Sequence, residues 1–499
     1  MARYFTFLML MLPLISFGQK EADVWLFDKN LGIDFNDNEF RSFNTTVNLN
    51  QTGATASMCD GTTGRLLFFT NGRTVWNASF TVMPNGAGLK GGVNTHQAAL
   101  IVPVPGADKR FYVFTTKSIE DPYAGGDAGL YYSLVDMDSN NGLGQVLAAQ
   151  KNTLLLSSAS DKLIAIPHTN QNDYWLITHE GNSDRFIVFH VTSAGIGPPV
   201  SFSFGIPYGY YESRGWLQAS PDGRMLACAV SSDGFMRNPL EWYDFDASAG
   251  IISNRRELGL YPELTGVSFS PDNSKLYFTF SDQLNDAIGG LCQMDLNAGD
   301  TEAVKLSRTD LYALHDPFPG AGTSHYDTIR DGVIQLAPDG RLYMKAIVPY
   351  SINENGTTIK KLKIYFIDKP NLPGFLCLPS GREFNGIFSS PNGWAFPNLM
   401  PHYFNGLEPI DNSGGKNDCA ESSIEVYPNP TSSLIKIDFA GNCNTVTDLD
   451  IYNSTGQLVD NVKIIEPFYT LDVSRMASGI YFFVFRSTEK RIVKKLVKQ

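Results

Sequence analysis

The sequence predicts an all-β protein, with a seven-bladed β-propeller followed by a small immunoglobulin-like β-sandwich. Three observations support this prediction. Aromatic residues make up 12% of the 499 residues and are accompanied by 45 Gly and 27 Pro, which combines strand formers with turn formers. A unit of apolar strand, polar turn and second apolar strand recurs between residues 53 and 400. Further short apolar stretches follow one another in residues 424–499.

The N-terminus has the features of a secretory signal peptide. An apolar run extends from Phe5 to Phe17, and the small residues Ser16 and Gly18 occupy the −3 and −1 positions of a cleavage site. The run is too short to span a bilayer, and no other segment of the sequence is apolar enough to do so. We therefore expect residues 1–18 to be a signal peptide and the rest to be exported without a transmembrane segment.

The repeats are most regular around three turns with the sequence Pro-Asp-Gly or Pro-Asp-Asn, in residues 217–226, 267–278 and 334–343. Pro sets the backbone for the first turn position, Asp bonds back to the backbone, and Gly or Asn accepts the left-handed exit. Looser copies occur at residues 60–69, 105–114, 170–177 and 388–394. Four strands per unit at this spacing are typical of a propeller blade.

Seven such units predict seven blades in residues 19–404, with six or eight as alternatives. A single blade cannot bury both of its faces, so the units must close into a ring. The last unit lacks strands, and the segment Val24–Phe27 is expected to supply one and fasten the ring. Two stacked sandwich domains are the competing all-β interpretation, which the regular spacing disfavours.

A polar, glycine-containing linker at residues 405–423 precedes the C-terminal domain, residues 424–499. The expected strands of this domain are Ile424–Tyr427, Leu434–Phe439, Leu449–Tyr452, Tyr469–Val473, Ile480–Phe485 and Ile492–Val497. Six or seven short strands suit a small immunoglobulin-like sandwich. The lysine-rich tail alternates charge and apolarity, which fits an edge strand that its lysines protect from further pairing.

Parts of the propeller region resemble known families. The Pro-Asp-Gly turns resemble those of WD-repeat-like and TolB-like propellers. Residues 64–77, 83–86 and 97–103 together are similar to the propeller region of large secreted Bacteroidetes proteins. This resemblance covers most of residues 21–405. It implies the fold and assigns no activity.

Four blocks follow one another near the C-terminus: Val426–Pro430, Thr455–Val459, Gly479–Tyr481 and the basic tail. They resemble the type A C-terminal sorting domain of the Bacteroidetes type IX secretion system. The resemblance implies Sec export, passage through the outer membrane by the type IX machinery, and a protein that is released or held at the cell surface. The motif residues that it implies are Tyr427, Pro428, Asn429, Pro430, Gly456, Gly479, Tyr481, Lys494 and Lys495.

The cysteines and the net charge limit the chemistry. A disulfide between Cys419 and Cys443 would close a short β-rich stretch. The other cysteines are scattered and are expected to be small buried hydrophobic residues: Cys59, Cys228, Cys292 and Cys377. No Cys or His spacing predicts a metal site, and no motif predicts a cofactor. A formal net charge of −12 argues against a nucleic-acid partner, which would need a basic face.

Two stretches are candidates for ligand binding. Tyr208, Tyr210 and Tyr211 precede Arg214, and exposed tyrosines flanked by charge can stack on sugar rings. The second stretch is the long connection between the fifth and sixth repeats, where sites often lie, and its candidates are His315, Asp316, His325, Asp327 and Arg330. The plain alternatives are tyrosines that pack between blades and a solvated loop.

Three classes of function remain open on the sequence. The first is a secreted or surface-attached binding or adhesion module for a glycan or a protein ligand, with its site at the central channel and loop face. The second is a secreted enzyme such as a glycoside hydrolase or lyase, which would need carboxyl groups from different blades to converge. The third is a structural protein of the cell envelope. No catalytic motif is present.

Overall fold

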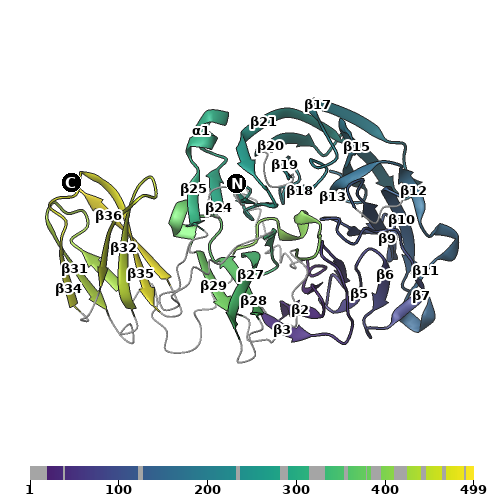
Figure 1. Cartoon of the computed structure of the whole chain (residues 1–499), viewed down its shortest axis with the longest axis horizontal. Helices are drawn as coiled ribbons and strands as arrows, with labels where there is room; N and C mark the ends of the chain where they lie inside the picture. The colour runs from purple at the N-terminus through teal and green to yellow at the C-terminus, as the bar shows by residue number, and fades with distance from the viewer. Residues whose placement is uncertain are drawn as a thin grey trace, which may run out of the picture.

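The computed structural model describes residues 19–36, 40–121, 127–231, 237–280, 290–313, 332–352, 358–377, 379–383, 395–408, 424–439, 446–463, 468–487 and 491–499. These residues form β-sheets arranged in a ring and a two-sheet sandwich at the C-terminus (Figure 1). The predicted fold class, a β-propeller with a C-terminal β-sandwich, is confirmed. Within the described ranges, no helix is long and apolar enough to cross a membrane.

The described residues up to Glu383 form seven antiparallel sheets, which we number in chain order. Sheet 1 consists of β1 (Val24–Phe27), β2 (Leu31–Asp34) and β3 (Arg41–Asn44). Sheet 2 consists of β4 (Ala56–Cys59), β5 (Leu66–Thr70), β6 (Thr74–Asn77) and β7 (Val82–Ala87). Sheet 3 consists of β8 (Ala99–Val104), β9 (Ala107–Lys117), β10 (Gly129–Asp136), β11 (Gln145–Val146) and β12 (Thr153–Leu156). Sheet 4 consists of β13 (Ala159–Pro167), β14 (Tyr174–Glu180), β15 (Ser183–Thr192), β16 (Gly195–Ile196) and β17 (Val200–Tyr208). Sheet 5 consists of β18 (Gly215–Ala219), β19 (Met225–Val230), β20 (Arg237–Asp246) and β21 (Ile251–Pro262). Sheet 6 consists of β22 (Gly266–Phe269), β23 (Lys275–Phe280), β24 (Gly290–Asp295) and β25 (Thr309–Ala313). Sheet 7 consists of β26 (Ile334–Leu336), β27 (Leu342–Ile352), β28 (Thr358–Ile367) and β29 (Pro379–Glu383).

Short helical segments connect some of these strands: η2 (Asn140–Gly142), η3 (Ala148–Gln150), α1 (Thr301–Leu306), η4 (Gly374–Cys377) and η5 (Pro401–Phe404). Sheets 2 to 7 coincide with the first six predicted repeats. The seventh predicted unit, residues 388–394, lies outside the described residues, so the number of blades stays a prediction.

The predicted turns form as their chemistry requires. In the turn of sheet 5, the Asp222 carboxylate accepts a hydrogen bond from the backbone N–H of Arg224 at 3.1 Å. Gly223 takes a φ of 71°, and the equivalent residues Asn273 and Gly340 take 64° and 75°. These are left-handed conformations that Gly and Asn adopt most readily. The turn residues therefore fix the hairpin between the first two strands of each sheet.

The ring closes through contacts between sheets 1 and 7. The N-terminal strand β1 pairs with β2 in the three-stranded sheet 1. The last predicted repeat lies outside the described residues, so the expectation that β1 completes it stays a prediction. The strand fastens the ring, because the Trp25 ring packs edge-on against Tyr343 at 6.1 Å between centroids. In addition, the Lys345 ammonium lies 2.7 Å from the Asp28 carboxylate.

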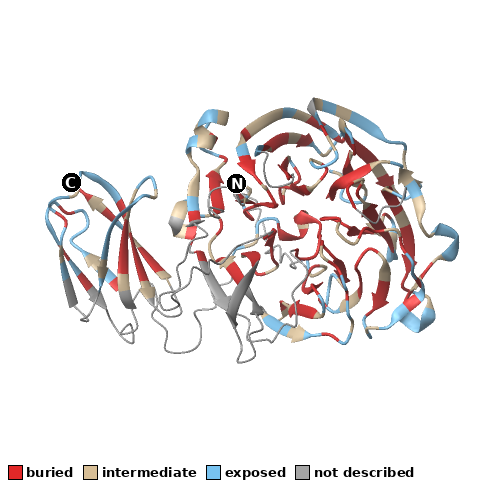
Figure 2. Cartoon of the chain, in the orientation of Figure 1, coloured by how far each residue is buried: buried red, intermediate tan, exposed pale blue. Residues whose placement is uncertain are grey.

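Burial decreases from the axis of the ring to its rim (Figure 2). The inner strands β1, β4, β18 and β22 are buried at every position, whereas the outer strand β3 is mostly exposed. The inner strands contact those of the neighbouring sheets, so both of their faces are covered. For this reason even the polar residues within these strands are buried, as Ser57, Gln218 and Ser268 are.

The C-terminal residues form two facing sheets, in the orders β30-β31-β34 and β33-β32-β35-β36. The strands are β30 (Ile424–Tyr427), β31 (Leu434–Phe439), β32 (Val446–Asn453), β33 (Leu458–Lys463), β34 (Phe468–Asp472), β35 (Gly479–Ser487) and β36 (Arg491–Lys498). Alternate residues such as Ile435 and Ile437 point into a shared apolar core. The lysine-rich strand β36 lies at the edge of its sheet, as predicted.

Candidate functional site

Tyr208, at the end of β17, is buried and does not lie at the surface. It is 6% exposed, its ring stacks on His179 at 4.2 Å between centroids, and Lys162 Nζ lies 5.1 Å from the ring centre. Its hydroxyl donates to Glu241, which also accepts from the Tyr243 hydroxyl at 2.7 Å. Tyr208 therefore packs between sheets 4 and 5, which corrects the expectation that it contacts a ligand.

Tyr210 and Tyr211 follow in the turn before β18 and are 46% and 49% exposed. Their rings meet edge to face, with centroids 5.2 Å apart and planes at 88°. The Tyr210 hydroxyl donates to the backbone oxygen of Glu120 at 3.3 Å, which ties this turn to the loop after β9. The pair presents two aromatic surfaces at right angles to each other, next to polar groups.

Four polar side chains from separate chain segments meet beside this pair, and we call them the inter-sheet cluster. They are His96 before β8, Glu120 after β9, Asp161 in β13 and Arg214 before β18. Arg214 forms an ion pair with Glu120, and His96 Nδ1 pairs with the Asp161 carboxylate. The backbone N–H of His96 also donates to Asp161 at 3.1 Å. The cluster thus joins segments that belong to or adjoin strands of sheets 3, 4 and 5.

The two carboxyl groups of the cluster have different environments. Burial raises the pKa of Glu120; the hydrogen bond from Arg214 opposes this rise, and the nearby Asp161 carboxylate adds to it. Asp161 is 1% exposed, and its Oδ1 accepts no hydrogen bond from the described residues. The Arg214 side chain is 35% exposed and brings the cluster to the surface. The arrangement can hold a polar ligand or exchange a proton with one.

The buried side chain of Lys162 holds the turn that precedes β18 in place. Its Nζ donates to three successive backbone oxygens, those of Glu212 and Ser213 at 3.2 Å and that of Arg214 at 2.8 Å. Lys162 is fully buried, and burial lowers its pKa. The backbone N–H of Asp161 donates to the same Ser213 oxygen at 3.0 Å. The conformation of the turn that carries Tyr210 and Arg214 therefore depends on a buried charge.

Residues of the inner strands also fill the axis of the ring. The Gln97 side-chain amide donates to the backbone oxygens of Leu163 and Leu217 at 3.0 Å, and its oxygen accepts from their N–H groups at 3.1 and 2.9 Å. Gln97 also donates to Asn398 Oδ1 at 3.1 Å, and Asn398 donates to the Ala99 oxygen. One glutamine thus bridges the first strands of sheets 4 and 5, and at this level the axis is occupied by side chains.

His179 is buried beneath the site and is uncharged in the folded protein. Burial, together with the neighbouring Lys162 charge, lowers its pKa to about 3, although its Nδ1 lies 2.8 Å from the Glu180 backbone oxygen. His168, His179 and His190 lie on or beside different strands. The Glu180 carboxylate forms an ion pair with Arg185.

The lowered pKa of His179 predicts a loss of stability in acid. Below about pH 6.5 the unfolded chain takes up a proton at this histidine, whereas the folded protein does not until the pH approaches 3. Its contribution to the free energy of unfolding is therefore expected to fall by about 2 kcal/mol between pH 7 and pH 5. Urea unfolding at both pH values measures this loss, and His179→Phe should reduce it by the same amount. An identical pH dependence in the variant would contradict the assignment.

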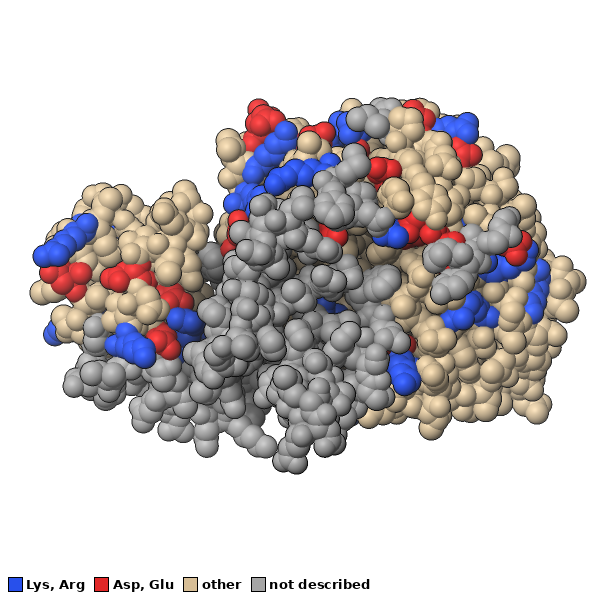
Figure 3. Space-filling model, viewed as in Figure 1, with Lys and Arg blue, Asp and Glu red and all other residues tan. Residues whose placement is uncertain are grey.

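The other predicted ligand residues lie outside the described residues: His315, Asp316, His325, Asp327 and Arg330. The predicted disulfide partners Cys419 and Cys443 lie outside them too. The remaining four cysteines are free and buried, as expected. In the described part of the chain, no three His, Cys, Asp or Glu residues are grouped as metal ligands. Lys and Arg are interspersed with Asp and Glu on the face shown in Figure 3.

The C-terminal motif has a structural role that the sequence alone does not reveal. Asn429 lies beside the edge strand β36, where its side-chain N–H donates to the Lys495 backbone oxygen at 2.6 Å. Its side-chain oxygen accepts from the Val497 N–H at 2.8 Å. Thr431 then continues the pairing, donating its backbone N–H to Val497 at 3.0 Å. The Pro-Asn-Pro motif therefore covers part of the open edge of the last strand.

Asn429→Ala is expected to destabilise the C-terminal sandwich by about 1–2 kcal/mol, because it removes two hydrogen bonds. Backbone amide exchange at Val497, followed by NMR or mass spectrometry, should become faster. Asn429→Asp keeps the acceptor for Val497 and loses only the donor, so it should retain most of the protection. Unchanged exchange in Asn429→Ala would show that the motif does not cover this edge.

Comparisons with known proteins identify the C-terminal domain. Residues 425–499 match the family described as secretion system C-terminal sorting domain. Together with the motif and the sandwich, this match supports a type A sorting domain of the type IX secretion system. This domain indicates secretion through that system to the cell surface or beyond, and in this chain it follows a β-propeller. No curated protein matches the chain in sequence.

Several solved structures match large parts of the chain at low sequence identity and low structural similarity. The periplasmic gluconolactonase of Pseudomonas aeruginosa is 12% identical over 85% of this chain and 95% of its own, with a TM-score of 0.37. The exo-beta-1,3-galactanase of Phanerochaete chrysosporium is 11% identical over 83% and 96%, with a TM-score of 0.33. An auxiliary nutrient binding protein of Bacteroides thetaiotaomicron is 10% identical over 68% and 84%, with a TM-score of 0.35. Because they include enzymes and a binding protein, these likenesses do not distinguish binding from catalysis.

Proposed function

We propose that residues 1–18 direct export, and that the propeller, residues 19–404, then acts as a binding module for a glycan or a protein ligand. The proposed contact surface is the turn with Tyr210 and Tyr211 and the adjoining inter-sheet cluster. The observation that carries the proposal is the exposed tyrosine pair next to the Arg214–Glu120 ion pair. Exposed aromatic rings beside fixed polar groups suit a ligand with both apolar faces and hydroxyls.

A glycan array tests this proposal with the chain that begins at Gln19. Retention on a defined class of glycan, lost in Tyr210→Ala and Tyr211→Ala, is the expected result. Leu306→Ala is the matched control, because Leu306 is 85% exposed on α1 and lies outside the proposed surface. A blank array with folded protein would overturn the glycan part, and a protein ligand or a structural role in the envelope would then lead.

A second candidate function, hydrolysis or elimination on a bound glycan, has one specific observation in its favour. Glu120 and Asp161 come from different sheets, and burial raises the pKa of the first, as a general acid requires. The test is release of new reducing ends from any retained glycan. Product formation that is lost in Glu120→Gln, while retention on the array persists, would establish catalysis. Retention without product would leave binding as the function.

A further inference from the structure

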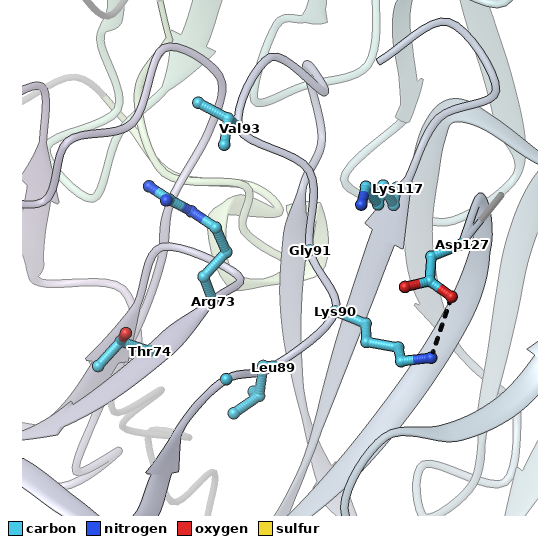
Figure 4. Close-up of a pocket in the computed structure, with 9 residues that line it drawn as sticks. Arg73, Thr74, Leu89, Lys90, Gly91, Val93, Lys117 and Asp127 are labelled. Carbon is cyan, nitrogen blue, oxygen red and sulfur yellow. Dashed lines mark hydrogen bonds and ion pairs between the residues drawn. The ribbon is translucent and has the colours of Figure 1, made fainter. Parts of the chain in front are cut away.

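A pocket with a volume of about 360 Å³ lies between sheets 2 and 3 (Figure 4). Its walls come from the turn between β5 and β6, which carries Arg73, the Gly88–Val93 segment before β8, and Lys117 at the end of β9. Asp127, just before β10, completes the wall. The volume is within the range of small-molecule sites. Neither Arg73 nor Lys117 was a candidate in the sequence, because no motif marks either of them.

The pocket carries more positive than negative charge. Three cationic side chains line it, those of Arg73, Lys90 and Lys117, against the single carboxylate of Asp127. Lys90 pairs with Asp127 at 3.4 Å, and this pair is largely exposed to solvent. The chain as a whole carries a formal charge of −12, so this local excess of cations runs against the overall balance.

Arg73 and Lys117 make no ion pair with any described residue. Arg73 donates through Nη2 to the Asn50 backbone oxygen at 2.5 Å, and its buried Nε has no hydrogen-bond acceptor among the described residues. A guanidinium with free donors binds planar oxyanions through paired hydrogen bonds. Burial lowers the pKa of Arg73, and the charge of the buried Asp121 carboxylate opposes this lowering. Three cationic side chains thus face two carboxylates in and beside the pocket. The remaining excess of positive charge is available to a negatively charged ligand.

The arrangement favours an extended ligand with several anionic groups. In Figure 4, Arg73 lies on one side of the Gly88–Val93 segment, and Lys117 lies on the other with the Lys90–Asp127 pair. A ligand lying across the segment would meet the cations one after another. Lys90 also lies 4.9 Å from the ring centre of the buried Tyr131, a contact that helps to fix the position of its charge.

We propose that this pocket binds an acidic saccharide through its carboxylate or sulfate groups. The choice of a saccharide rests on the proposed glycan-binding function, whereas the preference for an anion rests on the pocket alone. Nucleic acid fits less well, because it needs a long basic groove with successive aromatic rings.

The test is a titration of the chain beginning at Gln19 with oligogalacturonate, dextran sulfate and neutral dextran of similar length. The charged groups of oligogalacturonate are all carboxylates, and those of dextran sulfate are all sulfates. Comparing the two affinities therefore shows which of these groups the pocket binds. Binding of at least one acidic saccharide is expected to be at least tenfold tighter than binding of neutral dextran. Raising the salt concentration should weaken that binding.

Lys117→Gln and Arg73→Gln should each weaken binding of the acidic saccharide about tenfold. The matched control is Lys109→Gln, which removes the same charge from an exposed lysine paired with Asp138 outside the pocket. Thermal unfolding verifies that each variant is folded. If Arg73→Gln does not fold, Lys117→Gln alone still tests the proposal. Equal affinities in Lys117→Gln and Lys109→Gln would overturn the proposal. It would also be overturned if neither oligogalacturonate nor dextran sulfate bound more tightly than neutral dextran. Binding of neutral dextran that is lost when Tyr210 is replaced would support the proposed glycan-binding function and would contradict the preference for acidic saccharides.

Discussion

Replacing Lys345 by methionine is expected to lower the free energy of unfolding by about 3–5 kcal/mol. The Lys345 ammonium and the Asp28 carboxylate are 2.7 Å apart, and their side chains are 0% and 2% exposed. Removing the lysine leaves the Asp28 charge buried without its countercharge, which costs more than the loss of an ordinary contact. Because this pair joins sheets 1 and 7, the variant also weakens the closure of the ring.

Two further variants make this result specific. Lys345→Met combined with Asp28→Asn should recover much of the lost stability, because no charge is then buried alone. Lys109→Met removes an exposed lysine that pairs with Asp138 at 2.8 Å, and it should change the free energy of unfolding far less than Lys345→Met does, because solvent screens an exposed pair. Urea unfolding followed by tryptophan fluorescence measures all three. If Lys345→Met and Lys109→Met lower the free energy of unfolding by the same small amount, the buried pair does not hold the ring closed.

Lys162→Met is expected to destabilise the protein by about 2–4 kcal/mol and to abolish retention of a ligand on the proposed surface. Methionine fills a similar volume but cannot donate to the Glu212, Ser213 and Arg214 oxygens, which then lose their shared partner. The turn with Tyr210 loses its anchor, so the tyrosine pair and Arg214 no longer keep their relative positions. Lys162 touches no ligand in this account and acts as a positioning residue.

A second buried lysine separates stability from ligand binding. Lys275 is 6% exposed and bonds to Asp295 at 3.1 Å in sheet 6. Lys275→Met should also lower the midpoint of thermal unfolding, but it should leave ligand retention unchanged at temperatures where the protein is folded. Lys162→Met should also raise the pKa of His179, because one cause of its lowering is removed. Full ligand retention by Lys162→Met would refute its positioning role.

The local features of this protein could be predicted from sequence because their causes are local. The turn at Asp222 forms from four consecutive residues, and its Gly223 takes the left-handed conformation that the sequence indicates. The strands of the C-terminal sandwich follow from alternation, as in Ile435 and Ile437, whose side chains share one face.

The candidate site could not be predicted, since its contacts cross the ring. Gln97 and Leu217 are 120 residues apart in the chain, and Asp28 and Lys345 are 317 apart. Tyr208 is adjacent to the exposed turn in sequence, but it points between two sheets. One usable signal was a charged residue at the start of an apolar strand, because Lys162 directly precedes the run from Leu163. Such a residue must find partners in the folded protein.

The most direct test of the binding account is the affinity for the best-retained ligand, measured by calorimetry. The comparison uses the chain beginning at Gln19, the double variant Tyr210→Ala/Tyr211→Ala, and the control Leu306→Ala. We expect binding to be at least tenfold weaker in the double variant and unchanged in the control. Equal affinity in all three proteins would show that the ligand binds elsewhere and that the tyrosine pair is not the binding surface.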